Sequence, residues 1–261
     1  MNKKSIAFRL FFIAIISLTV ISCVPYSKIK YLQEKEGEAQ VYDFQNKIPD
    51  YRLKSGDYLY IKILTLDEKS NEIFASATGS GNRDYVTYSD QNLYLTSYLV
   101  NDSGYISFPL LGKIEARGHT VSEMEVSLNK AAREIIKEAS VVVKLVLFNV
   151  SVLGEVKNPG KYPVYTNRLN IFEAFAMAND LTTFADRSKV QVIRVENNKN
   201  NVVTLDLLGK DILSSPYYYL QPNDIIYVEP MKYKTYGFEA FPYVLVFSTI
   251  TTALLIASFF K

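Results

Sequence analysis

One short pattern, a polar turn followed by an alternating apolar strand, occurs twice in this chain of 261 residues and constrains its fold more than any other feature. The copies are YRLKSGDYLYIKI at residues 51–63 and YYLQPNDIIYVEP at residues 218–230. Apolar side chains at every second position are typical of a half-buried strand. Because a chain of this length can bury two separate cores, the repeat favours two modules.

The turns of the two copies share their chemistry. When the copies are aligned on their common leucines, Gly56 falls opposite Asn223. The next position is aspartate in both, Asp57 and Asp224. Gly and Asn tolerate a positive φ, and an aspartate there can accept bonds from nearby backbone amides. We therefore predict one type of turn at both places, with two unrelated turns as the alternative.

The composition of the chain bears on which classes of partner it could attract by charge. The chain has 29 basic and 27 acidic residues and a net charge of +2, so no strong field favours nucleic acid or an acidic partner. It has 20 Tyr and 15 Phe, and many of the tyrosines lie in alternating stretches that suit strands. We expect no nucleic-acid partner.

The first 22 residues have the form of a secretory signal, with a basic flank and a short apolar core. Cys23, the only cysteine, follows directly and has no disulfide partner within the chain. Residues 20–23, VISC, resemble the lipobox of bacterial lipoproteins, which implies cleavage before Cys23 and lipidation of its thiol. Residues 23–49 then form a lipidated tether. The alternative is an uncleaved N-terminal anchor with an incidental cysteine.

The middle of the chain predicts a turn, a strand and a helix. Residues 101–104, NDSG, form the turn, and residues 105–108 form the strand. Thr120 and Glu123 have the spacing of a capping box, so a helix should begin at Val121. Its apolar positions recur with helical spacing and predict a buried stripe, namely Met124, Leu128, Ala131 and Ile135.

The following residues predict a second compact unit of strands around a short helix. Residues 150–156 and 161–165 should form a hairpin, with a type II turn at residues 158–160 in which Gly160 takes a positive φ. A second capping box at residues 170–173 opens a helix that should carry Phe172, Phe175 and Ala176 inward. Residues 190–195 and 202–207 are further strands. The fold class is therefore α+β.

Residue types that carry chemistry form no recognisable site. The sole histidine, His119, has neither a second metal ligand nor a nucleophile near it in sequence. Gly79 and Gly81 lack the third glycine of a phosphate-binding fingerprint, since Asp84 occupies that position. The carboxylates lie mostly at caps and turns. We expect no catalytic residues, no metal and no cofactor.

The order and spacing of several motifs resemble the bacterial outer-membrane polysaccharide export proteins. Residues 50–147 are similar to their export domain through LxSGD, GxIxxPLLG and GxTxxE. Residues 148–232 are similar to their soluble-ligand-binding β-grasp (SLBB) domain through GEVxxPGxY and LQPNDxIYV. The turn and cap formers of these motifs are structural rather than sugar ligands: Gly56, Asp57, Gly104, Pro109, Gly112, Thr120, Glu123, Gly154, Pro159, Gly160 and Asp224.

This resemblance implies transport by a scaffold rather than an enzyme. Such proteins assemble as homo-oligomeric rings on the periplasmic side of the outer membrane and pass capsular polysaccharide or exopolysaccharide outward. They receive the polysaccharide from an inner-membrane copolymerase, often a tyrosine autokinase. The implied location is the outer membrane, lipid-anchored, with most of the chain in the periplasm. Alternatives are a lipoprotein module that binds glycan or a partner, and an envelope enzyme.

Residues 236–261 carry no charge between Glu239 and Lys261 and predict a C-terminal transmembrane helix. A helix from residue 238 to residue 260 would be about 34 Å long, against a hydrocarbon core of about 30 Å. A weakly polar stripe on it could line a pore or pack against other helices: Ser248, Thr251, Thr252 and Ser258. The helix could instead only anchor a ring whose pore another protein supplies, or span the inner membrane.

Overall fold

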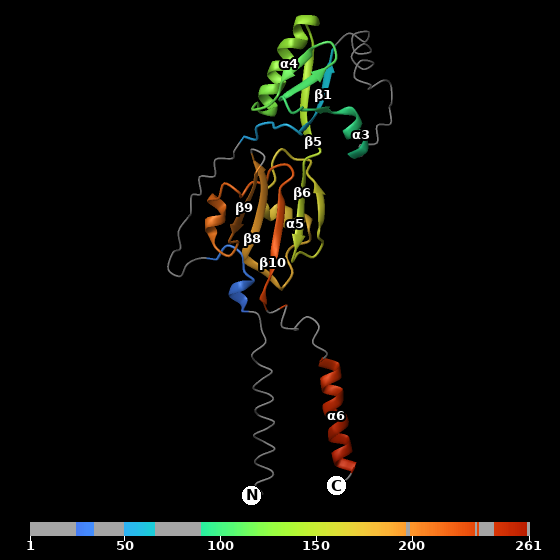
Figure 1. Cartoon of the computed structure of the whole chain (residues 1–261), viewed down its shortest axis with the longest axis vertical. Coiled ribbons are helices and arrows are strands. Elements are labelled where there is room, and N and C mark those ends of the chain that lie inside the picture. Colours follow the sequence, from blue (N-terminus) through green and yellow to red (C-terminus); the bar gives the residue numbers. More distant parts are fainter. Residues whose placement is uncertain are drawn as a thin grey trace.

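The computed structural model describes residues 25–33, 50–65, 90–196, 199–232, 234 and 243–259. These residues form two α+β units stacked end to end, each with its own hydrophobic core (Figure 1). The predicted signal sequence, the predicted lipidation site at Cys23 and the glycine-containing stretch at residues 78–82 lie outside the described residues.

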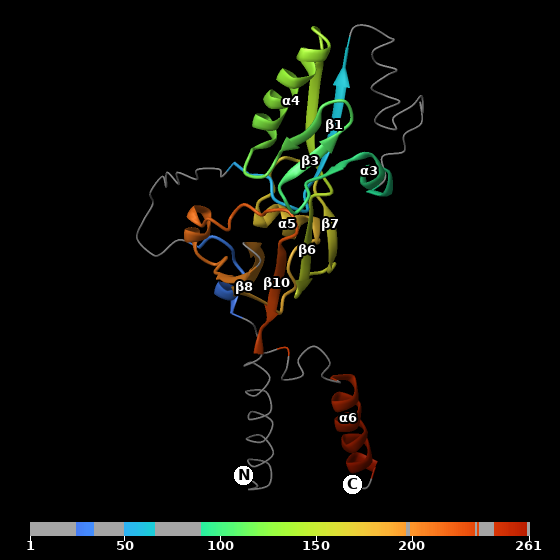
Figure 2. The same cartoon turned by 45° about the horizontal axis from the view of Figure 1, so that its top comes forward.

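The first unit is built on a three-stranded antiparallel sheet in the order β2-β1-β5. The strands are β1 (Tyr58–Leu64), β2 (Tyr98–Leu99) and β5 (Ser140–Val146). The strands β3 (Tyr105–Phe108) and β4 (Gly112–Glu115) form a separate hairpin. The helix α4 (Val121–Ile135) lies beside β5, and α3 (Asp90–Thr96) lies at the edge near β1 (Figure 2).

The core of the first unit follows the alternation of β1. Leu59, Ile61 and Ile63 point inward and pack with Val141 and Val143 of β5. From α4, Met124, Leu128 and Ala132 complete this core, so the predicted start and first two positions of the stripe are confirmed. The predicted last two positions are wrong: Ala131 is only half-buried and Ile135 is 54% exposed, because the buried row runs at four-residue steps through Ala132.

The second unit has a five-stranded sheet in the order β7-β6-β10-β8-β9. Its strands are β6 (Asn149–Gly154), β7 (Gly160–Pro163), β8 (Ala185–Glu196), β9 (Lys199–Leu205) and β10 (Ile225–Pro230). The first strand, β6, pairs parallel with the last, β10, and every other pair is antiparallel. The helix α5 (Ile171–Met177) covers one face of the sheet, and the 3₁₀ turn η2 (Lys210–Ser214) follows β9.

Two predictions about this unit are corrected. Gly160 does not have a positive φ, so the turn at residues 158–160 is not type II; the positive φ of this hairpin occurs earlier, at Gly154. In α5 the inward residues are Ile171, Ala174 and Phe175, whereas Ala176 is exposed. Ile171 is the first residue of this short helix and lies between the two capping residues. The buried face of the helix therefore begins at its first residue.

The C-terminal helix α6 (Tyr243–Phe259) lies apart from both sheets in Figures 1 and 2. Its 17 residues correspond to about 25 Å at 1.5 Å per residue. Within the residues described, no helix is both long and apolar enough to cross a membrane. The prediction of a transmembrane helix at residues 236–261 is therefore not supported.

Candidate functional site at the domain junction

The two predicted turns have the same geometry and the same hydrogen bonds. Gly56 has a φ of +93° and Asn223 a φ of +65°. The Asp57 carboxylate accepts a bond from the amide of Lys54 at 2.7 Å. In the other turn the Asp224 carboxylate accepts the equivalent bond at 2.8 Å, from Gln221. The prediction of one turn type used twice is confirmed.

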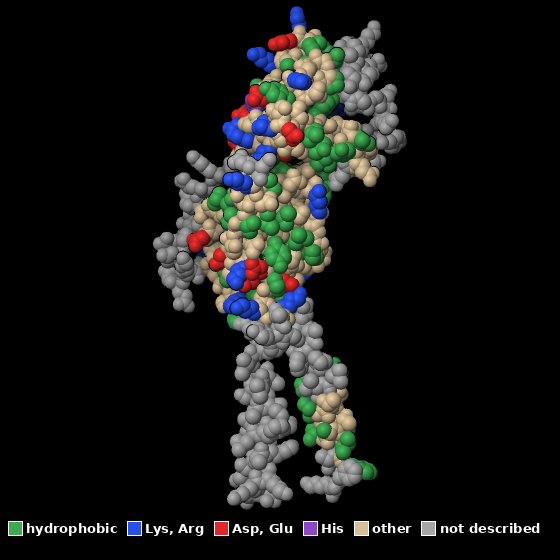
Figure 3. Space-filling view, in the orientation of Figure 1, with side chains coloured by type: hydrophobic (Ala, Val, Ile, Leu, Met, Phe, Trp, Pro, Cys, Tyr) green, Lys and Arg blue, Asp and Glu red, His purple; other side chains and the backbone are tan. Residues whose placement is uncertain are grey.

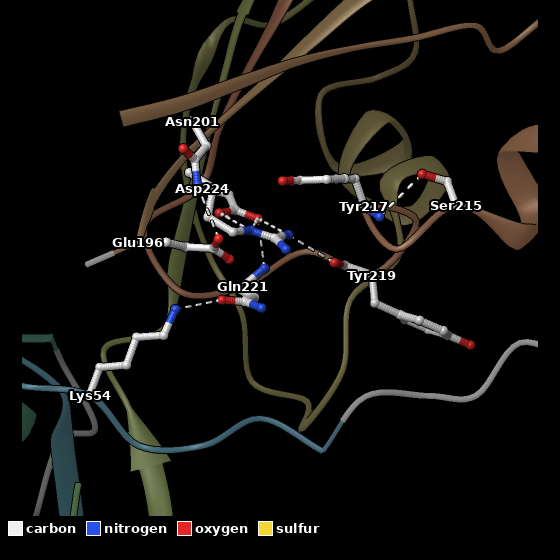
Figure 4. A network of polar contacts seen from close by, with 9 residues as sticks. Lys54, Glu196, Asn201, Ser215, Tyr217, Tyr219, Gln221 and Asp224 are labelled. Atoms are coloured by element: carbon white, nitrogen blue, oxygen red, sulfur yellow. Dashed lines mark hydrogen bonds and ion pairs between the residues drawn. The ribbon is translucent and has the colours of Figure 1, made fainter. Parts of the chain in front are cut away.

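These two turns face each other where the units meet. Lys54 Nζ donates a hydrogen bond to Gln221 Oε1 at 2.8 Å (Figure 4). The two side chains hold the same position in their turns, directly after the buried leucines Leu53 and Leu220. The repeated turn therefore starts a core strand in each unit and also supplies a contact between the units.

The turn of the second unit contains a buried ion pair. Arg194 of β8 contacts Asp224 through Nη2 to Oδ2 at 2.7 Å and through Nε to Oδ1 at 3.0 Å, and both side chains are at most 6% exposed. Nη2 also donates to the backbone oxygen of Tyr219 at 3.1 Å, and the guanidinium lies 4.7 Å from the ring centre of Tyr217. Burial raises the pKa of Asp224, and the Arg194 guanidinium opposes that shift.

The turn of the first unit has no such cation. The Tyr51 hydroxyl donates to both carboxylate oxygens of Asp57, at 3.0 and 2.8 Å. Burial raises the pKa of Asp57, and the bonds from the Lys54 amide and the Tyr51 hydroxyl only partly oppose it. Burial and the neighbouring Asp57 carboxylate also raise the pKa of Tyr51. Equivalent aspartates therefore have different electrostatic environments.

A cleft of about 880 Å³ opens between the two units beside these turns. Both units line it, and its charged side chains are four cations and three carboxylates: Arg52, Lys54, Arg117, Arg168, Asp50, Asp102 and Glu196. In Figure 3 Lys and Arg side chains gather on one side of the molecule at the level of the junction. The cleft also contains aromatic surface from Phe148 and Tyr219.

Gly104 positions one of these cations. A side chain at Gly104 would come within 2.8 Å of Cβ of Arg117, and Gly104 has a φ of +92°. The Gly104 carbonyl accepts bonds from the amides of Ala116 and Arg117 at 2.8 and 2.9 Å. The Arg117 guanidinium then reaches Ser55 Oγ and the Asp102 carbonyl. The glycine of the predicted motif thus lets Arg117 lie against the turn at residues 101–104.

The other predicted motif residues are local structure formers. Thr120 and Glu123 form a complete capping box on α4. Gly112 has a φ of +78° and, with Pro109, belongs to the tip of the β3–β4 hairpin. Gly154 has a φ of +86°, and a Cβ there would lie 2.1 Å from the carbonyl oxygen of Val228. Pro159 is exposed, and Gly160 opens β7.

Three hydroxyl groups of α6 donate hydrogen bonds within the helix. Thr251 donates to Phe247 O and Ser248 O, Thr252 donates to Ser248 O, and Ser258 donates to Leu255 O, at 2.7 to 3.0 Å. Ser248 supplies a carbonyl acceptor to this set. The described side chains of the helix are exposed. Of the predicted stripe, Thr251, Thr252 and Ser258 therefore use their hydroxyl donors on backbone carbonyls of their own helix.

The sequence did not reveal that the tether docks on the second unit. The 3₁₀ turn η1 (Tyr26–Lys28) lies beside β8, and the amides of Leu32 and Gln33 donate to the carbonyls of Leu207 and Leu208. The Tyr31 hydroxyl donates to Asp180 Oδ1 at 2.6 Å. The Arg187 guanidinium lies 5.0 Å from the Tyr31 ring centre. Residues 25–33 therefore extend the packed structure of this unit.

Sequence reasoning also missed Arg52, Lys54, Arg117 and Arg168 as members of one cleft, and Arg194 as the partner of Asp224. The available signal was that Lys54 and Arg117 lie inside or beside the predicted turn motifs. Among the described residues no group of His, Cys, Asp and Glu could hold a metal ion. The side chains that line the cleft can bind a ligand through charge and hydrogen bonds.

Comparison with known proteins follows the same division into two parts. Residues 45–146 match the family model described as polysaccharide biosynthesis/export protein, and residues 149–228 match the SLBB domain model. The chain is 27% identical over 189 residues to the EPS I polysaccharide export outer membrane protein EpsA of Ralstonia solanacearum. That match covers 70% of this chain and 49% of the relative, so the chain spans about half the length of the curated relative that it matches.

Proposed function

Because this chain belongs to the polysaccharide biosynthesis/export family, we propose that it is an outer-membrane lipoprotein that assembles as a periplasmic ring and exports capsular polysaccharide or exopolysaccharide. The family is a transport component rather than an enzyme. Cys23 carries the lipid in this proposal, and most of the chain lies in the periplasm. The polysaccharide arrives from an inner-membrane copolymerase, which in similar systems is often a tyrosine autokinase.

The observation that carries the proposal is the junction between the two units. The residues that match the export and SLBB models form separate cores, and equivalent turns join them through Lys54 and Gln221. The predicted motif residues serve turns, caps and close strand contacts. Such an arrangement suits a scaffold subunit whose surfaces, rather than a reactive centre, perform its work.

A second candidate is a periplasm-facing lipoprotein module that binds glycan or a partner while another protein supplies the pore. The α6 hydroxyls favour it, because Thr251, Thr252 and Ser258 donate to carbonyls of their own helix. A hydrated pore lined by this helix would need groups that bond readily to water. We propose that the two candidates share the periplasmic scaffold and differ in what crosses the outer membrane.

The export function is tested by a clean deletion in a host that has no paralogue. We expect loss of surface polysaccharide with normal synthesis of its sugar nucleotides, and recovery when the intact chain is supplied. Normal surface polysaccharide in the deletion strain contradicts the proposal. Recovery by a variant with Cys23→Ala, made with its signal intact, would contradict the lipoprotein part alone.

The two candidates are separated by labelling the C-terminus. The change Lys261→Cys introduces a thiol, while lipidation blocks Cys23. Labelling of intact cells by a membrane-impermeant maleimide would place residue 261 outside and support a chain that crosses the outer membrane. Labelling only after permeabilisation of the outer membrane would support the periplasmic module and a separate pore.

A further inference from the structure

The junction cleft contains cations that its own carboxylates do not neutralise. Arg52 pairs with Glu123 at 3.4 Å, and Lys54 bonds to the neutral amide of Gln221. Arg117 bonds to a hydroxyl and a carbonyl. Over the described part of the chain, neither Arg117 nor Arg168 forms an ion pair with a carboxylate. One of these arginines comes from each unit.

We propose that this cleft binds carboxylate groups of an acidic polysaccharide, with Arg117 and Arg168 as the recognising cations. The inference deepens the proposed export function and rests on it. A guanidinium presents planar, paired donors that match the two oxygens of a carboxylate, and such charge-assisted bonds are about twice as strong as neutral ones. A cleft with unpaired guanidinium groups therefore favours uronic acid units over neutral sugars.

The remaining lining fits a short stretch of sugar chain. The volume of about 880 Å³ lies within the range of about 300–1,000 Å³ typical of ligand sites. Phe148 and Tyr219 supply apolar surface, while Ser55 and Asn167 supply polar groups for hydroxyls. Of the three carboxylates, Glu196 already accepts a bond from Asn201 at 3.1 Å. The carboxylates at Asp50 and Asp102 restrict where an acidic unit can lie.

The chain also provides for the position of Arg117. Gly104 leaves the space that the base of the Arg117 side chain occupies, and its carbonyl holds the Arg117 amide. The two bonds from Nη2 hold the guanidinium against the turn. Because both acceptors of Arg117 are neutral, its positive charge is not balanced by them and can attract a carboxylate ligand.

The test measures binding to the full mature chain in detergent by isothermal titration calorimetry. The probes are tetragalacturonate, its fully methyl-esterified form and the neutral maltotetraose. We expect binding of tetragalacturonate that weakens as salt rises, and at least 10-fold weaker binding of the other two probes. Absence of binding by tetragalacturonate, or equal binding of its methyl ester, overturns the inference. This part of the test uses only the wild-type chain.

Variants then locate the site. Arg117→Gln and Arg168→Gln should each weaken binding of tetragalacturonate about 10-fold, which corresponds to the loss of one charge-assisted contact. Lys113→Gln and Lys161→Gln make the same charge change at exposed positions outside the cleft and should leave binding within about 2-fold. Equal losses in all four variants would show nonspecific attraction and overturn the assignment. Circular dichroism confirms that each variant is folded.

Failure of the acidic-glycan site and failure of the export function give different results. If the deletion strain loses surface polysaccharide and the wild-type chain does not bind tetragalacturonate, export stands and the acidic-glycan site is wrong. If the cleft binds the acidic probe but deletion leaves surface polysaccharide unchanged, export is wrong. The binding result then supports the glycan-binding module.

Discussion

At Gly154 the packing of two strands leaves no space for a side chain. It lies at the end of β6 with a φ of +86°, and a Cβ there would be 2.1 Å from the Val228 carbonyl oxygen of β10. We expect Gly154→Ala to lower the free energy of unfolding by about 3 kcal/mol or more, since backbone must move. Urea denaturation of the variant measures this loss.

Two other glycines serve as controls for Gly154. Gly56 has a φ of +93° but open space around it, so Gly56→Ala should cost about 1–2 kcal/mol from the backbone conformation alone. Gly160 has no positive φ, and its nearest neighbour would be 3.7 Å away, so Gly160→Ala should change stability by less than about 1 kcal/mol. An equal loss in all three variants would contradict the role of the Val228 contact.

The two turn aspartates provide a matched pair at the residue scale. Asp224→Asn removes the charge that balances the buried Arg194, so we expect the free energy of unfolding to fall by about 3 kcal/mol. Asp57→Asn leaves no buried cation unpaired and should cost about 1 kcal/mol. Chemical denaturation of both variants checks the difference. Equal losses would mean that the Arg194 pair adds nothing beyond the shared turn.

The pH dependence of the free energy of unfolding should reveal the raised pKa of Asp57. Because burial raises the pKa of Asp57, the folded state binds this proton more tightly than the unfolded state does. The contribution of Asp57 to stability is therefore greatest below the ordinary pKa of 3.8 and falls as pH rises through 3.8 to the raised value. The stability of the wild type minus that of Asp57→Asn should decrease over this window. A difference that increases with pH would contradict the shift.

At the scale of elements, the capping boxes set where the helices begin. The Thr120 side chain accepts from the Glu123 amide at 3.1 Å, and the Glu123 carboxylate accepts from the Thr120 amide at 2.8 Å. We expect Thr120→Ala to lower the free energy of unfolding by about 1 kcal/mol. Ser127→Ala, an exposed mid-helix change in α4, should be neutral or slightly stabilising. A loss of similar size in both variants would contradict the cap as its cause.

For the whole molecule, the contact between Lys54 and Gln221 is the feature to test. Lys54→Met removes the 2.8 Å bond while it retains most of the side-chain length, so the units should move more freely while each remains folded. Small-angle scattering should show a broader distribution of interatomic distances. Lys62→Met, at an exposed position of β1, is the control. An unchanged distribution in Lys54→Met would show that other contacts fix the junction.

The sequence by itself determined the local structure of this chain. The alternation in residues 51–63 predicted the strand β1, in which Leu59 and Ile61 are buried. The spacing of Thr120 and Glu123 predicted the first residue of α4. The turn of Gly56 and its repeat at Asn223 were equally readable. Each of these depends on residues within a few positions of one another, so the information lies in one short segment.

Only the tertiary structure decided which segments meet. The parallel pairing of β6 with β10, the approach of Lys54 to Gln221 and the gathering of Arg117 with Arg168 join residues far apart in the chain. Periodicity does not state a partner, so it could not predict them. The same reason explains the docked Tyr31, whose partner Asp180 lies 149 residues away in the chain.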